Sequence, residues 1–203
     1  MMKKPQKYNR KSLRLKGYNY TQSGLYFVTI CCQNRLHLFG EIPKDEMVLN
    51  ETGQMIEEEW LTLPKRFPNI KLHEYIVMPN HFHAILEITT VRNSAEETLM
   101  VSSHSHDDVG QPQGIAPTLS PADGKISEWE KNPRLGDIVG AFQSITTVKY
   151  IQGVKTKGWA AFHKKVWQRN YWDVIIWNEK SYLNISKYIL NNARNWREDK
   201  FGK

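Results

Sequence analysis

Apolar residues along the chain follow two different periods, one typical of strands and one typical of helices. Runs rich in β-branched and aromatic residues predict strands at 25–32, 74–88 and 171–177. The run at 74–88 is interrupted by a Met-Pro-Asn bend, and a short apolar run at 47–49 predicts an edge strand. The chain therefore has at least three strong strand segments, widely spaced along its length.

Three other segments carry apolar residues at helical spacing. The first is capped by Asn50, and the prolines Pro64 and Pro68 are expected to end it. The second starts at Arg134. The third is capped by Asn178, and its apolar stripe runs as far as Trp196.

The order strand, helix, strand, insertion, helix, strand, helix predicts an α+β fold. A ferredoxin-like sandwich, with a mainly antiparallel sheet and the helices on one face, fits this order best. Residues at about 91–133 are rich in Ser, Gly, Pro, Asp and His and lack a period, which predicts a flexible insertion. We expect an arm at 1–16 and one catalytic domain at 17–203.

The charge of the chain favours a polyanionic partner. Its 203 residues carry a formal net charge of +7. The two cysteines, Cys31 and Cys32, are adjacent in a predicted strand, so their side chains diverge and they form no disulfide framework. This fits a reducing cytoplasm, and no apolar run is as long as a membrane span, about 20 residues.

Two basic regions are candidates for nucleic-acid binding. The arm contains seven cations and no acid, namely Lys3, Lys4, Lys7, Arg10, Lys11, Arg14 and Lys16. Between Asp137 and Asp173, basic residues are interleaved with tryptophans, an arrangement that suits a nucleic-acid single strand with stacked bases. The basic residues are Lys149, Lys155, Lys157, Lys164, Lys165 and Arg169. The alternatives are a solvated tail for the arm, and a basic helix end with core tryptophans for the second region.

The predicted strand at 74–88 contains a His-x-His motif. Residues two apart in a strand share a face, so His81 and His83 lie side by side and can bind a divalent metal. The alternative is a pair of polar residues on a half-solvated sheet face. A second motif, His104-Ser-His106, falls in the insertion, where no strand holds it.

The last predicted helix places Tyr188 one residue off its apolar stripe, with Asn192 one turn further along the same flank. A helix packed on the sheet could therefore direct a hydroxyl and an amide across it. The alternative for Tyr188 is a partly buried aromatic residue whose hydroxyl is hydrogen-bonded.

Several motifs together resemble the single-tyrosine HUH transposases, and within them the REP-associated tyrosine transposases of bacteria. These are MPNHFHAIL, WQRNYWD, YILNN, GLYFVTICCQNRLHLFGEI and LGDIVGAFQSITTVKYI. The resemblance covers most of residues 24–196, without the insertion. The residues after Asn192 read Ala-Arg-Asn-Trp, where many relatives have proline next.

The resemblance implies a ferredoxin-like fold, a Mg²⁺ or Mn²⁺ ion, and a helix-borne tyrosine that attacks single-stranded DNA beside a hairpin. By position, His81 and His83 match the metal pair, Tyr188 matches the nucleophile, and Asn192 matches the residue that completes the metal site. The product would be a 5′-phosphotyrosine and a free 3′-OH. Relatives include both monomers and homodimers.

Attack by tyrosine needs activation, because at pH 7 only about one unperturbed tyrosine in a thousand is ionised. A metal can polarise and orient the phosphate, and a covalent link retains the bond energy for rejoining strands. No general base is identified, and Tyr171 is the rival nucleophile.

Two other functions remain open from the sequence. A non-catalytic module that binds single-stranded nucleic acid needs the basic arm and the aromatics but not a metal. A zinc-dependent hydrolase would use His81 and His83 with a third ligand such as His73 or His163.

Overall fold

The computed structural model describes residues 19, 20, 22–89 and 133–198. The seven cations of the predicted arm, His104 and His106, and nearly all of the predicted insertion lie outside the described residues. The division into an arm and a catalytic domain therefore stays a prediction.

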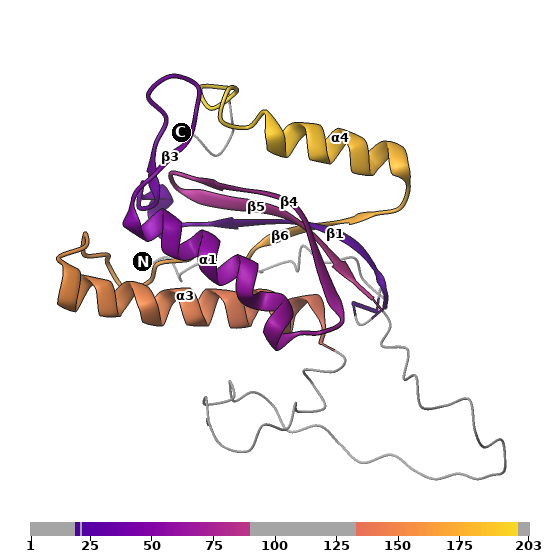
Figure 1. Cartoon of the computed structure of the whole chain (residues 1–203), viewed down its shortest axis with the longest axis horizontal. Coiled ribbons are helices and arrows are strands. Elements are labelled where there is room, and N and C mark those ends of the chain that lie inside the picture. Colours follow the sequence, from indigo (N-terminus) through magenta and orange to yellow (C-terminus); the bar gives the residue numbers. More distant parts are fainter. Residues whose placement is uncertain (1–18, 21, 90–132, 199–203) are drawn as a thin grey trace, which may run out of the picture.

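A four-stranded antiparallel sheet forms the centre of the molecule (Figure 1). Its strands are β1 (Gly24–Cys31), β4 (Ile70–Met78), β5 (His81–Ile88) and β6 (Trp172–Ile176), in the order β4-β5-β1-β6. The two central strands, β1 and β5, are each paired on both edges, and β5 is buried along nearly its whole length. This strand order is the one expected of a ferredoxin-like sandwich.

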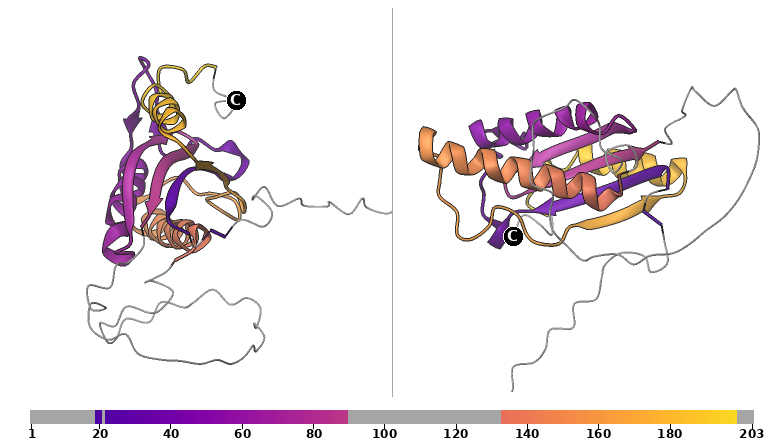
Figure 2. Two further views of the ribbon diagram at one scale, coloured as in Figure 1. Left: turned by 90° about the vertical axis from the view of Figure 1, so that its right-hand side faces the viewer. Right: turned by 90° about the horizontal axis from the view of Figure 1, so that it is seen from below.

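Two helices cover one face of the sheet (Figure 2). They are α1 (Glu51–Arg66) and α3 (Leu135–Lys157). Trp60 of α1 packs edge-on against Phe82 of β5 and Phe142 of α3, with ring centroids 4.8 and 5.4 Å apart. All three rings are buried, so this aromatic cluster holds the two helices and the sheet together.

The last helix, α4 (Glu179–Leu190), lies on the opposite face of the sheet, as Figures 1 and 2 show. Ile189 of its apolar stripe packs with Ile85 of β5 and Ile176 of β6 in a second, smaller cluster. The predicted α+β class with an antiparallel sheet is confirmed, but the helices are not all on one face. The second face carries His81, His83 and Ile85 of β5, which are all buried, and Ile85 packs with Ile189 of α4.

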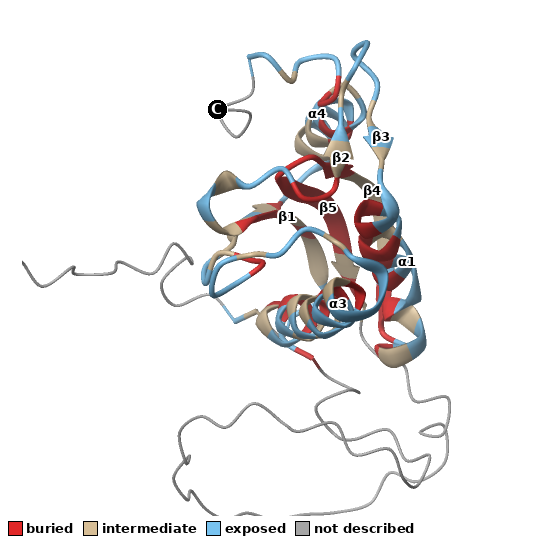
Figure 3. Ribbon diagram, turned by 90° about the vertical axis from the view of Figure 1, so that its left-hand side faces the viewer, coloured by how far each residue is buried: buried red, intermediate tan, exposed pale blue. Residues whose placement is uncertain are grey.

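Short elements complete the described fold. The 3₁₀ turn η1 (Gln33–Arg35) follows β1, and the strands β2 (Gly40–Glu41) and β3 (Val48–Leu49) form a separate two-stranded ribbon. Figure 3 shows buried residues concentrated in β5 and on the inner side of α1. Of the helices in the described segments, none combines the length and apolar character needed to cross a bilayer.

Two helix ends differ from the sequence prediction. Helix α1 continues through Pro64 to Arg66, so the prediction that Pro64 ends it is wrong. A proline near the end removes one hydrogen bond, and the buried Trp60 and Leu63 of the preceding turn keep the helix in place. Helix α4 ends at Leu190, before the predicted stripe is complete, and the chain continues in turns.

Gly53 in α1 is a position where the packing requires glycine. A Cβ at Gly53 would overlap the carbonyl oxygen of Phe39, which is backbone and cannot rotate away. We expect Gly53→Ala to lower the free energy of unfolding by about 1–3 kcal/mol, as other overpacked sites do. Urea unfolding followed by circular dichroism measures it.

Gly140 in α3 is the matched control. A Cβ there meets no atom within 4 Å, and the residue is exposed. Gly140→Ala should raise the free energy of unfolding by about 0.5–1 kcal/mol, because alanine loses less backbone entropy in a helix. Equal destabilisation by both substitutions would contradict the assigned contact at Gly53.

Candidate active site

The candidate site lies at the start of β5, where a tight turn delivers two histidines to the face that α4 covers. The turn at Pro79 and Asn80 is anchored by backbone hydrogen bonds: the Asn80 carbonyl accepts from the Cys32 amide at 2.8 Å, and the Pro79 carbonyl accepts from the Leu38 amide at 2.8 Å. His81 pairs across the sheet with Cys31 of β1. These bonds fix the position from which the His-x-His motif begins.

His81 and His83 are side by side, as the alternation of a strand predicts. Their ring centroids are 4.5 Å apart, and both side chains are fully buried. The interpretation of the pair as half-solvated surface residues is therefore wrong. Two buried imidazoles in contact need specific partners, because neither ring can be hydrated in place.

Each imidazole has a hydrogen-bond partner at Nδ1. The Nδ1 of His81 lies 2.8 Å from Oδ1 of Asn80, and the Nδ1 of His83 lies 2.8 Å from Oγ1 of Thr29, the residue paired with it across the sheet. An amide oxygen only accepts, so His81 donates from Nδ1, and in the neutral ring this leaves the lone pair on Nε2. Metal-binding histidines are typically oriented in this way by a partner on the other nitrogen.

Tyr188 of α4 contacts His83 on the face of the sheet that α4 covers. Its hydroxyl lies 3.2 Å from Nε2 of His83, and the two ring centroids are 5.3 Å apart. Phe27 of β1 stacks on His83 and touches Tyr188 edge-on, at 5.3 and 6.1 Å between centroids. The Tyr188 side is open: 38% of this residue is exposed, whereas the histidines beneath it are not.

Asn192 follows α4 in the turn that leads to Trp196, and only 1% of it is exposed. Tyr188 contacts His83, and the Trp196 ring stacks on His81 at 5.9 Å between centroids. The segment 188–196 therefore spans both histidines, with Asn192 midway along it.

The donor types fit a divalent metal ion. Two imidazole nitrogens and an amide oxygen form a mixed set that Mn²⁺ accepts readily and Mg²⁺ accepts less well, since Mg²⁺ prefers oxygen ligands. Within the described residues, no group of three His, Cys, Asp or Glu side chains could hold a metal. A zinc site of the hydrolase type thus lacks its third strong ligand in this part of the chain.

The two other histidines considered as zinc ligands lie elsewhere. His73 of β4 is bound to Glu87, with its Nε2 2.9 Å from Oε2, and its Nδ1 lies 3.3 Å from the Tyr182 hydroxyl. His163 is exposed in the segment between α3 and β6. The rival nucleophile Tyr171 is half-buried and packs against the main core, on the side of α1 and α3.

Comparison with known proteins places the chain in a family. No family model matches it. A protein of Haemophilus influenzae, described as uncharacterized, is 34% identical over 194 residues, which cover 95% of this chain and 92% of that protein. The chain belongs to the same family as this protein. The match extends over the strands and helices that build the site.

Two solved structures resemble this chain in fold. One is a REP-associated tyrosine transposase bound to a REP hairpin, with 17% identity, a TM-score of 0.44, and 88% of this chain and 72% of that chain covered. The other is a candidate transposase of Deinococcus radiodurans, with 14% identity, a TM-score of 0.40, and 88% and 95% covered. At these values the likeness concerns the fold and not the activity.

The predicted basic residues that fall in the described segments have different surroundings. Lys149 and Lys157 of α3 form ion pairs with Glu59 and Glu51 of α1, on the face opposite the histidines. The remaining ones, all exposed, are Lys155, Lys164, Lys165 and Arg169. The segment just before Arg169 runs beside the end of β1, where the Gln168 amide donates to the Cys31 carbonyl at 2.8 Å.

Sequence reasoning did not find Thr29, Asn80 or Phe27. Asn80 directly precedes the motif, so its contact with His81 could have been considered from spacing alone. Thr29 and Phe27 become visible only when the register of β1 against β5 is known.

Thr29 offers a test of how the site is held. Thr29→Val keeps the size and β-branching of the side chain but removes the partner of His83 Nδ1. We expect Mn²⁺ binding to become about 10-fold weaker, which is at the lower end of the losses in metal affinity seen when a hydrogen-bond partner of a ligating histidine is removed. Isothermal titration calorimetry measures it, with Thr62→Val in α1 as the control. Equal Mn²⁺ affinity in both variants would show that Thr29 does not orient the ligand.

Proposed function

We propose that this protein cleaves single-stranded DNA and transfers the strand through a covalent link to Tyr188. The observation that carries this proposal is the 3.2 Å approach of the Tyr188 hydroxyl to Nε2 of His83. A nucleophile and a metal-binding pair, far apart in sequence, are brought within reach of one phosphate.

The chain's own residues have separate tasks in this reaction. His81 and His83, together with Asn192, would hold Mg²⁺ or Mn²⁺. When bound, the ion supplies charge that polarises a phosphate oxygen and orients the group for in-line attack. Thr29 and Asn80 keep the imidazoles in the orientation that binding needs. Phe27 packs against the rings of His83 and Tyr188 and keeps the phenol over the histidines.

In the cleavage step, the Tyr188 oxygen bonds to phosphorus and loses its proton. The bond from phosphorus to the 3′ oxygen breaks, and that oxygen takes up a proton to become a free 3′-OH. The 5′-phosphotyrosine retains the phosphodiester energy, so a 3′-OH can later attack it and rejoin a strand. Hydrolysis by water would lose this energy, which is why a covalent intermediate suits strand transfer.

The partially exposed phenol supports a polymeric substrate. A DNA strand can reach Tyr188 from solvent. The two histidines below it are buried, so water is excluded around them and electrostatic interactions at the proposed metal site are strong. We propose a hairpin-forming DNA single strand as the substrate class, because the motifs around the site resemble those of transposases that act beside hairpins.

The test is an incubation with a hairpin-bearing DNA single strand, labelled at its 5′ side in one sample and its 3′ side in another, with Mn²⁺ or Mg²⁺. A denaturing gel should show a protein adduct on the 3′-side label and a shortened free strand on the 5′-side label. Cleavage without adduct would indicate a hydrolase. A native mobility shift with neither product would indicate a binding module.

A further inference from the structure

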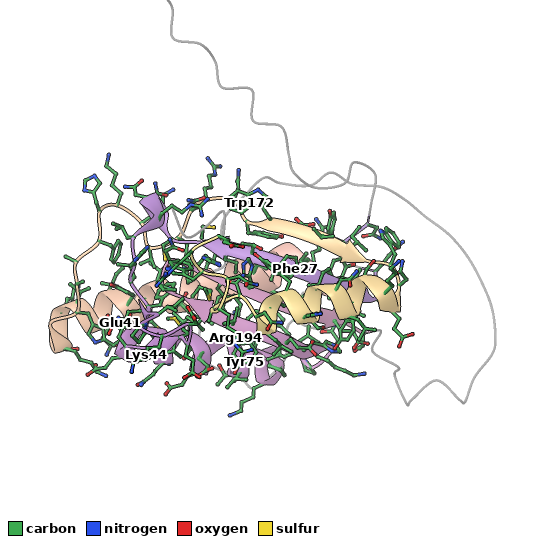
Figure 4. All side chains as sticks on the ribbon, turned by 90° about the horizontal axis from the view of Figure 1, so that it is seen from above. Phe27, Glu41, Lys44, Tyr75, Trp172 and Arg194 are labelled. Carbon is green, nitrogen blue, oxygen red and sulfur yellow. The ribbon has the colours of Figure 1, made fainter. Side chains whose placement is uncertain are left out.

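An open furrow runs along α4, on the side that faces β1 and β6. Two hollows, of about 430 and 560 Å³, lie along this side and share Asn184 as a lining residue. Helix α4 packs closely on β4, at the far edge of the sheet, where the Tyr182 hydroxyl donates to Oε2 of Glu74 at 2.9 Å. On the opposite side of the helix, the described residues leave the two hollows open. Figure 4 shows Phe27 between α4 and β6, under this side.

The hollow around Tyr188 is cationic and rich in amides. Besides the phenol it is lined by Asn184, Lys187, Asn191, Arg194 and Asn195. Among these described lining residues none is acidic, so no carboxylate of the lining repels a phosphate. Lys187 directly precedes Tyr188 in α4, and Arg194 lies in the turns that follow the helix, so both cations line the hollow together with the phenol. Lys and Arg in such positions bind backbone phosphates.

The second hollow has a different chemistry. Trp177, at the end of β6, is 68% exposed, and Val174 of the same strand is 51% exposed. Asp173 also lines this hollow and would repel a phosphate. A large exposed indole beside an acid suits the uncharged face of a base, which every nucleotide has. Trp177 lies just before α4, and Tyr188 lies nine residues after Glu179, the first residue of the helix. Nine residues span about 14 Å along a helix, which corresponds to a few nucleotides.

We infer that this furrow is the track for the DNA single strand, with two kinds of contact. Lys187 and Arg194 hold the phosphates that flank the one attacked by Tyr188. Trp177 stacks on a base a few nucleotides away, on one side of the cleavage point. The inference rests on the proposed function for the reaction at Tyr188, and it adds the residues that position the substrate.

The first experiment measures the affinity of the full chain for a fluorescein-labelled DNA single strand by anisotropy at several salt concentrations. The Tyr188→Phe background prevents any cleavage during the titration. The double variant Lys187→Gln with Arg194→Gln should bind more weakly, and the slope of log K against log salt should fall by about 1.4, or about 0.7 for each phosphate that is no longer neutralised. Both residues are exposed, so the fold should be retained, as the melting temperature will show.

The matched control removes two exposed cations that do not line the furrow, Lys65→Gln in α1 and Lys71→Gln in the edge strand β4. It changes the net charge equally and should leave the slope unchanged. Equal slopes for the furrow variant and the control would overturn the assignment of Lys187 and Arg194.

Trp177 is tested in the same assay. Trp177→Ala should weaken binding by about 5- to 100-fold without changing the salt slope, and Trp177→Phe should restore most of the affinity, because a stacking face remains. An unchanged affinity in Trp177→Ala would overturn the stacking contact.

The furrow and the proposed function can fail separately. If the furrow variants bind DNA more weakly as expected but no adduct forms with the native Tyr188, the assignment of the furrow is supported and the covalent reaction is rejected. If an adduct forms while the furrow variants bind normally, the reaction stands and the strand follows another path.

Discussion

Replacing Tyr188 by phenylalanine is expected to abolish the covalent DNA adduct and to slow strand cleavage by about 10³-fold or more, since the attacking atom itself is removed. The fold should survive, because the ring remains and keeps its contacts with Phe27 and His83. The substitution removes the hydroxyl together with its hydrogen bond to His83 Nε2. Single-turnover cleavage of a labelled hairpin strand measures the effect.

Two other tyrosines serve as controls. Tyr182 lies on the same helix, but burial, and then its hydrogen bond to Glu74 and the charge of that carboxylate, raise the pKa of its phenol. Tyr182→Phe should therefore leave the adduct intact, as should Tyr171→Phe in the segment before β6. If Tyr171→Phe abolished the adduct and Tyr188→Phe did not, the assigned nucleophile would be wrong.

Loss of the histidine pair should have an effect of similar size. We expect His81→Asn with His83→Asn to reduce metal-dependent cleavage by about 10² to 10³-fold, because two of the three proposed ligands change length and geometry. Chelation of the metal should do the same to the unchanged protein. Binding of single-stranded DNA, measured by anisotropy, should change little, since both histidines are buried beneath the furrow.

His73 provides the control for the histidines. It lies on the same side of the sheet but bonds to Glu87 and Tyr182, so His73→Gln should retain metal-dependent cleavage. Normal cleavage by the His81 and His83 double variant would mean that the metal binds elsewhere. Loss of cleavage in His73→Gln, with the fold intact, would point instead to a site at β4.

The core of the site was within reach of sequence reasoning because it depends on short-range geometry. The two-residue period of a strand places His81 and His83 together, and the helical period places Tyr188 beside the apolar stripe that packs on the sheet. Each of these statements needs only the neighbours of a residue in the chain.

The parts that sequence reasoning missed depend on contacts between distant segments. Thr29 reaches His83 only because β1 pairs with β5 in one particular register. The ion pair of Lys149 with Glu59 depends on how α1 packs against α3, so the sequence alone does not show that this lysine is paired within the fold. The position of α4 on the second face likewise depends on contacts between distant segments, such as Ile189 with Ile85 and Ile176.

The most direct test of the proposed chemistry is to locate the DNA in the adduct. After cleavage of a hairpin strand, excess DNA is removed by nuclease and the adduct is digested with trypsin. Trypsin cuts after Lys187 and after Arg194, so it should release the peptide 188–194, in which Tyr188 is the sole tyrosine. Mass spectrometry should find a nucleotide joined through its 5′ phosphate to that peptide. A nucleotide on peptide 170–180, which contains Tyr171, or on peptide 181–187, which contains Tyr182, would contradict the assignment of Tyr188 as the nucleophile.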